Sequence, residues 1–445
     1  MSSIRTIPSH RSSAMLSLNS DILLTFISFL TEDFSTDDAS KLSRNCSQLC
    51  QFWRQVILDS PSIWGKLINF NDFRHSNDQW MEEILRRSGS SLLWINGRVH
   101  GNTAERTEAL QTLFFAILND HWDRIQKIQI YIYQFKEKDR HKWRAIYRPA
   151  PHLQVFNVHP PPISSIPLLL LDLPCLFADH APSLRAFNMQ ATFPVSPKAP
   201  WLSALRIVHL HFPLKLPQIL DALGTMHLLE SFTISLPTFI PYSPTTNADE
   251  ATIHLPNLSQ LYLLANLSMA MRLITALQVP PGCSFRMRFL GGDVITESVS
   301  LVPLLQVTQN YFQSNRPKKV WLTSQHSEFM FSDYDPANPD TVRPFTPFFS
   351  VHMTSTAIMT ETIRLLTCAV TLPSADMSSV THLHVISEGL FARRTSHEFF
   401  LSLASIKTIT ITQDMISYLP LSLADPSKDA FPLLGMIRIK GWTDG

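Results

Sequence analysis

The chain has 445 residues and 45% of them are hydrophobic, which is enough to bury the cores of roughly two or three domains. Its 37 Lys and Arg residues almost balance its 36 Asp and Glu residues, and the net charge is +1. Such a charge gives no overall field that would attract nucleic acid or a membrane surface, so the expected partners are proteins.

Cysteine content and apolar runs bear on the compartment. The odd number of cysteines, without a CxxC pair, predicts reduced thiols in the cytoplasm or nucleus. Residues 1–15 are rich in serine and have no apolar segment of signal-peptide length, so we expect a disordered tail. The most apolar run, residues 163–177, is interrupted by Pro167, Asp172 and Pro174 and is too short for a membrane helix. We therefore expect no membrane association.

Residues 16–70 contain two short runs with the apolar spacing of amphipathic helices. The first run can be capped by Asn19 or Ser20, and a polar loop is expected over residues 31–40. The apolar positions are Ile22, Leu23, Phe26, Ile27 and Leu30 in the first run and Leu49, Phe52, Trp53, Val56 and Ile57 in the second. About fifty residues cannot enclose so many large side chains, so part of this surface should contact the rest of the chain or another protein.

This stretch resembles an F-box, the helical module that binds the Skp-type adaptor of a cullin-RING ubiquitin ligase. Pro61 matches the family pattern near the end of the module, whereas Leu18-Asn19 replaces the usual Leu-Pro opening and the loop over residues 31–40 is long for the family. The resemblance implies adaptor contacts at Leu18, Ile22, Leu23, Ile27, Leu30, Leu49, Cys50, Trp53, Val56 and Trp64.

Residues 71–122 are expected to form a helical coupling segment. An amphipathic helix should begin near Gln79 and stop at Gly89, followed by a short extended run to Val99 and a helix over residues 103–122. The sequence from Trp80 to Ser90 also resembles the segment that follows the F-box in proteins of mushroom-forming fungi.

Residues 123–445 contain a six-residue repeat with apolar first, fourth and sixth positions and a polar or amphipathic fifth position. This alternation predicts a strand with one face in a core and the other in solvent. The nine copies start at Ile125, Leu153, Leu184, Leu205, Leu229, Leu258, Val380, Ile406 and Leu434. Three further strands are expected at residues 285–290, 319–322 and 348–353, which makes about twelve.

The spacing of these units predicts the fold class. Starts separated by 21 to 31 residues, up to Leu258, leave room for a returning segment between parallel strands. We therefore expect an α/β protein in which the helical F-box precedes an irregular solenoid that resembles a leucine-rich-repeat array. The alternative is a doubly wound α/β enzyme, but no glycine-rich turn follows an early strand.

Signals for catalysis and ligand chemistry are sparse. The sequence has no GxSxG, Walker, GxGxxG or HExxH motif and no zinc-type cluster, so we expect no enzyme activity, cofactor or metal. A hydrolase with dispersed catalytic residues stays open as a rival. The basic run over residues 136–148 is interpreted as a solvated helix rather than a nucleic-acid site, because Glu137 and Asp139 dilute its charge.

Together these features predict a non-catalytic substrate receptor of a cullin-RING ligase, which would bind an unknown protein substrate on the strands. The alternative is an interaction scaffold whose first helices only cap the solenoid. Strand alternation gives the candidate substrate contacts Gln129, Asn157, Asn188, His209, Gln260, Tyr262, His382, His384 and Arg438.

Overall fold

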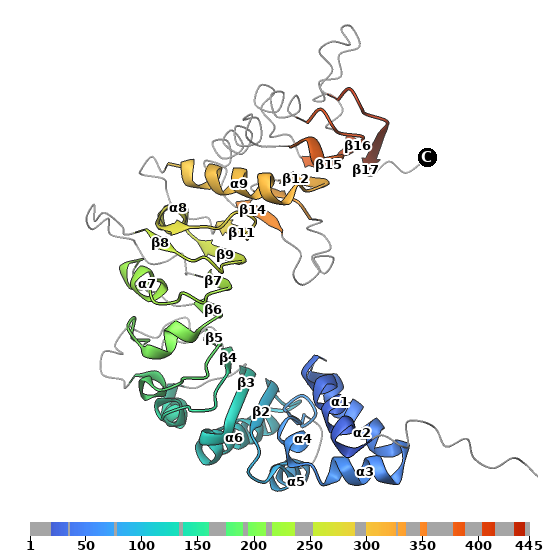
Figure 1. The fold of residues 1–445 in the computed structure, drawn as a ribbon, viewed down its shortest axis with the longest axis vertical. Helices are drawn as coiled ribbons and strands as arrows, with labels where there is room; N and C mark the ends of the chain where they lie inside the picture. The colour runs from blue at the N-terminus through green and yellow to red at the C-terminus, as the bar shows by residue number, and fades with distance from the viewer. Residues whose placement is uncertain are drawn as a thin grey trace, which may run out of the picture. The chain divides into compact units, whose positions relative to one another are not determined.

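The computed structural model shows a mixed α/β protein with mostly parallel strands, as the sequence predicts (Figure 1). The chain divides into two compact units, Met1–Ser196 and Pro197–Gly445. The structure describes residues 19–33, 36–74, 78–132, 137–159, 175–189, 195–210, 216–235, 252–289, 300–325, 328–334, 348–353, 377–387, 403–413 and 431–440. The expected tail over residues 1–15 lies outside these ranges.

The first unit opens with four helices. They are α1 (Ser20–Asp33), α2 (Thr36–Leu49), α3 (Gln51–Leu58) and α4 (Pro61–Gly65). Asn19 accepts a hydrogen bond from the backbone N–H of Asp21, and Cys50 caps α3 by accepting one from Trp53. The predicted loop over residues 31–40 is wrong, because α1 continues to Asp33 and α2 starts at Thr36.

The first unit continues with five parallel strands in sequence order. They are β1 (Ile68–Asn69), β2 (Leu93–Val99), β3 (Ile125–Ile132), β4 (Val155–His159) and β5 (Ala186–Met189). Because β1 and β2 belong to this sheet, the expected boundary between residues 122 and 123 does not mark its edge. The region predicted as a helical coupling segment contributes a full strand.

Helical segments return the chain between these strands. They are α5 (Asp78–Ser88), α6 (Ala104–His121) and the 3-10 helices η2 (Trp122–Arg124), η3 (Glu137–Tyr147) and η4 (Leu176–Asp179). Thr103 caps α6 by accepting from the N–H of Arg106, and α6 packs on β2 and η3. Edge-to-face contacts join Phe114 of α6 to Phe70 and Trp143 in the core. The basic run thus folds as a helix that buries its tryptophan.

The second unit contains ten strands of one sheet and a separate two-stranded pair. In spatial order they are β6 (Ile207–Leu210), β7 (Ser231–Ser235), β9 (Gln260–Ala265), β11 (Ser284–Phe289), β14 (Phe349–Met353), β13 (Glu328–Ser332), β12 (Lys319–Gln325), β15 (His382–Ser387), β16 (Thr408–Thr412) and β17 (Met436–Lys440). Only β13 runs antiparallel to its neighbours among these described strands. The separate pair is β8 (Ile253–His254) with β10 (Leu277–Gln278).

The helices of the second unit cover one face of its sheet (Figure 1). They are α7 (Leu216–Leu223), α8 (Leu267–Ala276) and α9 (Val302–Asn315), with short 3-10 turns at Pro200–Ala204 and Met377–Ser379. The helix α8 contacts α7, α9 and β9. Strand side chains on this face, such as Phe232, Leu263 and Phe285, are fully buried. We call the opposite face of the strands, in either unit, the polar face.

All nine repeat units lead into a strand, and the three strands expected between residues 285 and 353 are present as β11, β12 and β14. The strand β13 was not predicted. It follows β12 after only two residues, a connection that permits an antiparallel hairpin but is too short for a parallel crossover.

Candidate protein-binding surfaces

The helices α1, α2 and α3 pack against one another around a small apolar interior. Leu23, Ile27, Trp53 and Trp64 are between 0% and 5% exposed. These four were expected to contact an adaptor directly, but in the conformation observed their side chains pack inside the first unit and are not accessible to another protein. They stabilise the packing of the helices and do not form part of the solvent-exposed surface. Leu18 and the side chain of Leu30 lie outside the described part of the chain.

A second apolar stripe on α1 faces solvent. Ile22, Phe26 and Phe29 follow one another at steps of four and three residues, which places them on one side of the helix. They are 56%, 44% and 61% exposed, and Leu49 at the end of α2 and Phe52 on α3 are 64% and 43% exposed. We call these five residues the exposed apolar surface. Cys50 and Val56, two other expected contacts, are half-buried.

The sequence interpretation left Phe26, Phe29 and Phe52 out of the expected contacts. The signal that identifies the first two is the spacing of Ile22, Phe26 and Phe29, which gives α1 an apolar stripe separate from the one through Leu23 and Ile27. The helix α1 therefore has one apolar stripe inside the first unit and a second stripe in solvent.

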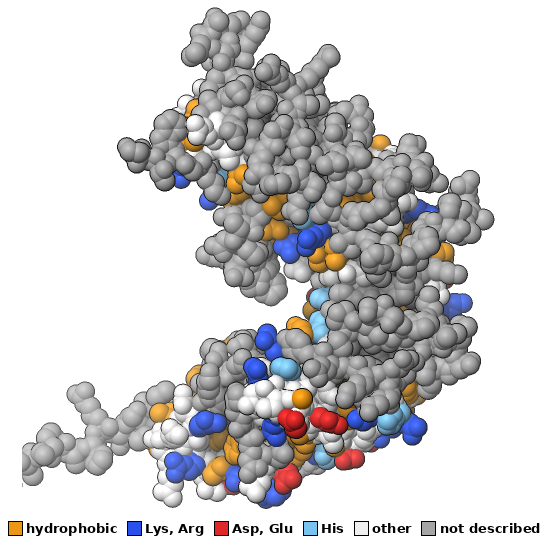
Figure 2. Space-filling view, turned by 180° about the vertical axis from the view of Figure 1, so that it is seen from behind, with side chains coloured by type: hydrophobic (Ala, Val, Ile, Leu, Met, Phe, Trp, Pro, Cys, Tyr) orange, Lys and Arg blue, Asp and Glu red, His pale blue; other side chains and the backbone are white. Residues whose placement is uncertain are grey.

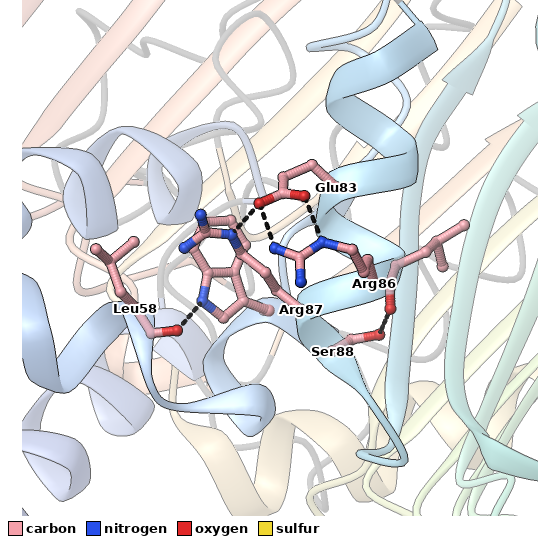
Figure 3. A network of polar contacts seen from close by, with 7 residues as sticks. Leu58, Glu83, Arg86, Arg87 and Ser88 are labelled. Carbon is pink, nitrogen blue, oxygen red and sulfur yellow. Dashed lines mark hydrogen bonds and ion pairs between the residues drawn. The ribbon is translucent and has the colours of Figure 1, made fainter.

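Trp64 fixes the three-helix module to the following helix α5. Its indole Nε1–H donates to the carbonyl oxygens of Ile57 and Leu58, at 3.0 and 3.2 Å, and the guanidinium of Arg87 lies 4.7 Å from its ring centroid. Figure 3 shows Arg86 and Arg87 both reaching the Glu83 carboxylate. Hydrogen bonds from Arg86 and then Arg87 lower the pKa of Glu83 to about 2. The cationic partner of Trp64 is therefore held in place by an ionised carboxylate.

On the polar face of the first unit, the fifth repeat positions align in one row. Gln129 pairs in register with Asn157, which pairs with Asn188. Gln129 is exposed and Asn157 is half-buried. Asn188 is a correction, because it is only 6% exposed and its amide nitrogen lies 3.4 Å from His159 Nε2. His159 also stacks on Tyr131 of β3, with ring centroids 4.3 Å apart.

The second unit has a row of its own across its sheet. Strand pairing places the following side by side, in spatial order: His209, Thr233, Tyr262, Arg286, Ser350, Ser332, Trp321, His384, Thr410 and Arg438. The expected register is therefore correct for His209, Tyr262, His384 and Arg438. Gln260 and His382 precede this row by two positions on their strands, on the same face.

The titratable groups described on these surfaces have separate local environments. No three His, Cys, Asp or Glu side chains in the described ranges are placed to hold a metal ion. His382 bonds the Thr381 hydroxyl through Nδ1, and His384 stacks on Trp321 with ring centroids 4.7 Å apart. Burial lowers the pKa of His209 and raises that of the Cys283 thiol to about 12. Neither group is thereby activated as a general acid or a nucleophile at neutral pH.

Arg286 was not among the expected contacts. The repeat pattern did not identify it, because no repeat unit was assigned between Leu258 and Val380, although residues 285–290 were expected to form a strand.

Figure 2 shows the side-chain types on one side of the molecule, where most acidic side chains in view lie over the first unit.

Within the described ranges, every helix is too short or too polar to cross a membrane. Comparison with known proteins finds no protein-family model and no curated protein that matches this chain.

Proposed function

We propose that the chain is a substrate-recognition subunit of a cullin-RING ubiquitin ligase. In this proposal α1, α2 and α3 bind a Skp-type adaptor, and the polar faces of the strands bind a protein substrate. The observation that carries the proposal is the exposed apolar surface on the module whose sequence resembles an F-box.

The size of the exposed side chains supports docking on another protein. Burying an Ile, Leu or Phe side chain stabilises a complex by roughly 1.5 to 3 kcal/mol, so five such side chains represent a large unfavourable surface when left in water. Interface energy is concentrated in a few apolar anchors of this kind. Leu23, Ile27 and Trp53 have a different role, because they fill the interior that holds the exposed stripe in place.

The strands supply a surface suited to binding rather than bond chemistry. Their polar faces carry accessible side chains such as Gln129, Tyr262 and Arg438 on strands about 4.8 Å apart, and no group of three His, Cys, Asp or Glu side chains among the described residues could hold a metal ion. In the receptor, this surface would hold a substrate near the ligase and contribute position only.

Co-purification with a Skp-type adaptor tests the proposal. The double variant Ile22→Asp with Phe29→Asp places two charges on the exposed stripe and should abolish adaptor capture while the thermal unfolding midpoint stays close to that of the wild type. Leu228→Asp is the matched control, since Leu228 is an exposed apolar residue of the second unit. Failure of the wild type to capture the adaptor contradicts the proposal.

A second candidate function is an interaction scaffold that never joins a ligase. The contact between α2 and β1 favours it, because helices that cover the first strand of a sheet act as a cap. The scaffold predicts that the same double variant changes no adaptor binding and that the wild type does not bind the adaptor.

A further inference from the structure

The polar face of β9, β11 and β14 carries a cationic cluster without a described anionic partner. Arg286 and Arg288 lie two positions apart on β11 and therefore point to the same side of the sheet. Strand pairing places Tyr262 beside Arg286 on one side and Ser350 on the other, and places His352 beside Arg288. We call Arg286, Arg288 and these neighbours the β11 cluster.

Three aromatic rings surround the Arg286 guanidinium. Its Cζ atom lies 5.0 Å from the ring centroid of Phe348, 5.4 Å from Tyr334 and 5.7 Å from Tyr262. Phe348 and Tyr334 also contact each other edge to face, at 5.9 Å. Rings around a guanidinium restrict its rotation and exclude water, while its N–H donors stay in the guanidinium plane, where a planar acceptor can meet them.

No described carboxylate neutralises this cluster. Neither Arg286 nor Arg288 forms an ion pair with any residue that the structure describes, and the Nε–H of Arg286 is buried without a hydrogen-bond partner. The acidic side chains described in the second unit are accounted for elsewhere. Asp221 lies on α7, Glu230 pairs with Arg206, and Asp333 bonds the hydroxyl of Tyr311.

We propose that the β11 cluster binds an acidic segment of a protein substrate and that the Arg286 guanidinium holds one of its carboxylates. A planar guanidinium with free N–H groups matches a carboxylate by two parallel hydrogen bonds, and aromatic neighbours strengthen such a charge-assisted pair by lowering the local dielectric. Tyr262, which is half-buried beside Arg286, adds a hydroxyl group on the β9 side. This inference names the substrate class of the proposed receptor and rests on that function for its biological role.

Binding of a short labelled peptide of alternating Glu and Ser to the full chain tests this inference without the adaptor. The wild type should bind the Glu peptide at least about tenfold more tightly than the corresponding Gln peptide. Arg286→Gln should abolish this preference, and Arg286→Lys should retain part of it because the charge remains. Arg316→Gln is the matched control, since Arg316 is an exposed arginine at the end of α9, outside the strands, and should leave affinity within about twofold.

Equal affinity of the wild type for the Glu and Gln peptides overturns the inference. The inference also fails if Arg286→Gln lowers the thermal unfolding midpoint but leaves peptide affinity unchanged, because the arginine would then serve packing. Tighter binding of a phosphoserine peptide or of a single-stranded RNA of similar charge, lost in the same variant, would overturn the assignment to carboxylates. If the wild type does not capture the adaptor but prefers the Glu peptide, only the ligase function is refuted. If the wild type captures the adaptor but does not prefer the Glu peptide, only the acidic substrate is refuted.

Discussion

The hydroxyl of Tyr311 in α9 donates a hydrogen bond to Oδ2 of Asp333, the residue that follows β13. Oδ1 of the same carboxylate accepts a hydrogen bond from the backbone N–H of Phe349 at 2.7 Å, at the start of β14. One carboxyl group thus connects α9 to the end of β13 and the start of β14, which pair antiparallel.

This carboxyl group should make stability depend on pH. Burial raises the pKa of Asp333 to about 6 from its ordinary value of 3.8, although the hydrogen bonds from Phe349 and Tyr311 oppose the shift. The folded state therefore retains a proton that the unfolded state releases, which stabilises folding below pH 4, and this contribution is lost as the pH rises through about 6.

Asp333→Asn removes the titration and keeps a polar side chain of the same size. We expect the difference in unfolding free energy between the wild type and the variant to fall by up to about 3 kcal/mol as the pH rises from 4 to 7. Chemical denaturation at several pH values measures it. A difference that does not change with pH would contradict the role of Asp333.

Buried and exposed apolar residues of α1 should respond differently to truncation. Leu23→Ala should lower the unfolding free energy by about 2 to 5 kcal/mol, because it opens a cavity in a closed interior. Phe29→Ala should change stability by less than about 1 kcal/mol and should weaken adaptor binding instead. Thermal unfolding and adaptor capture separate the two effects, and equal destabilisation by both variants would show that Phe29 is part of the core.

Trp64 should matter more for stability than the ion pairs beside it. Trp64→Phe keeps an aromatic ring but removes the donor to Ile57 and Leu58, so we expect a loss of about 1 to 3 kcal/mol. Glu83→Gln should cost much less than Trp64→Phe, since an exposed ion pair contributes little. Denaturant midpoints rank the two variants, and a larger effect of Glu83→Gln would contradict this account.

Gly97 in β2 is held at a φ of +104°, and a Cβ atom there would lie 2.6 Å from Asn69 Oδ1 and 2.9 Å from the Asn71 nitrogen. Gly97→Ala should therefore lower stability by about 2 kcal/mol or more, through backbone strain and the clash with β1. Gly435→Ala serves as the control, because the nearest atom to its Cβ would be 3.9 Å away and its φ is not positive. Similar unfolding midpoints for the two variants would contradict this account.

The sequence predicts the strands well because alternation is a local signal. The units starting at Leu153 and Leu258 each place a buried residue before the strand and a polar residue at the fifth position, in the register that the sheet requires. In contrast, β13 was missed because its pairing depends on the strands around it. The pattern of Phe329 and Phe331 is too short to indicate direction.

The helical module shows a different limit of sequence analysis. The helix α2 is mostly polar, and its apolar positions Leu42, Cys46 and Leu49 give only a weak periodic signal, so the sequence predicted a loop over residues 31–40 and placed Leu49 in the next helix. Periodicity also cannot separate two apolar stripes into a buried one and an exposed one. That distinction between Leu23 and Ile22 depends on which faces α2 and α3 cover, and only the packed structure defines it.

The affinity of the purified chain for a purified Skp-type adaptor, measured by isothermal titration calorimetry, tests the central claim most directly. We expect a dissociation constant of about 1 μM or tighter for the wild type. We expect an increase of at least about a hundredfold for Ile22→Asp with Phe29→Asp, because each charge would be buried without a partner at the interface. No measurable binding by the wild type, or unchanged affinity of the double variant, would contradict the account.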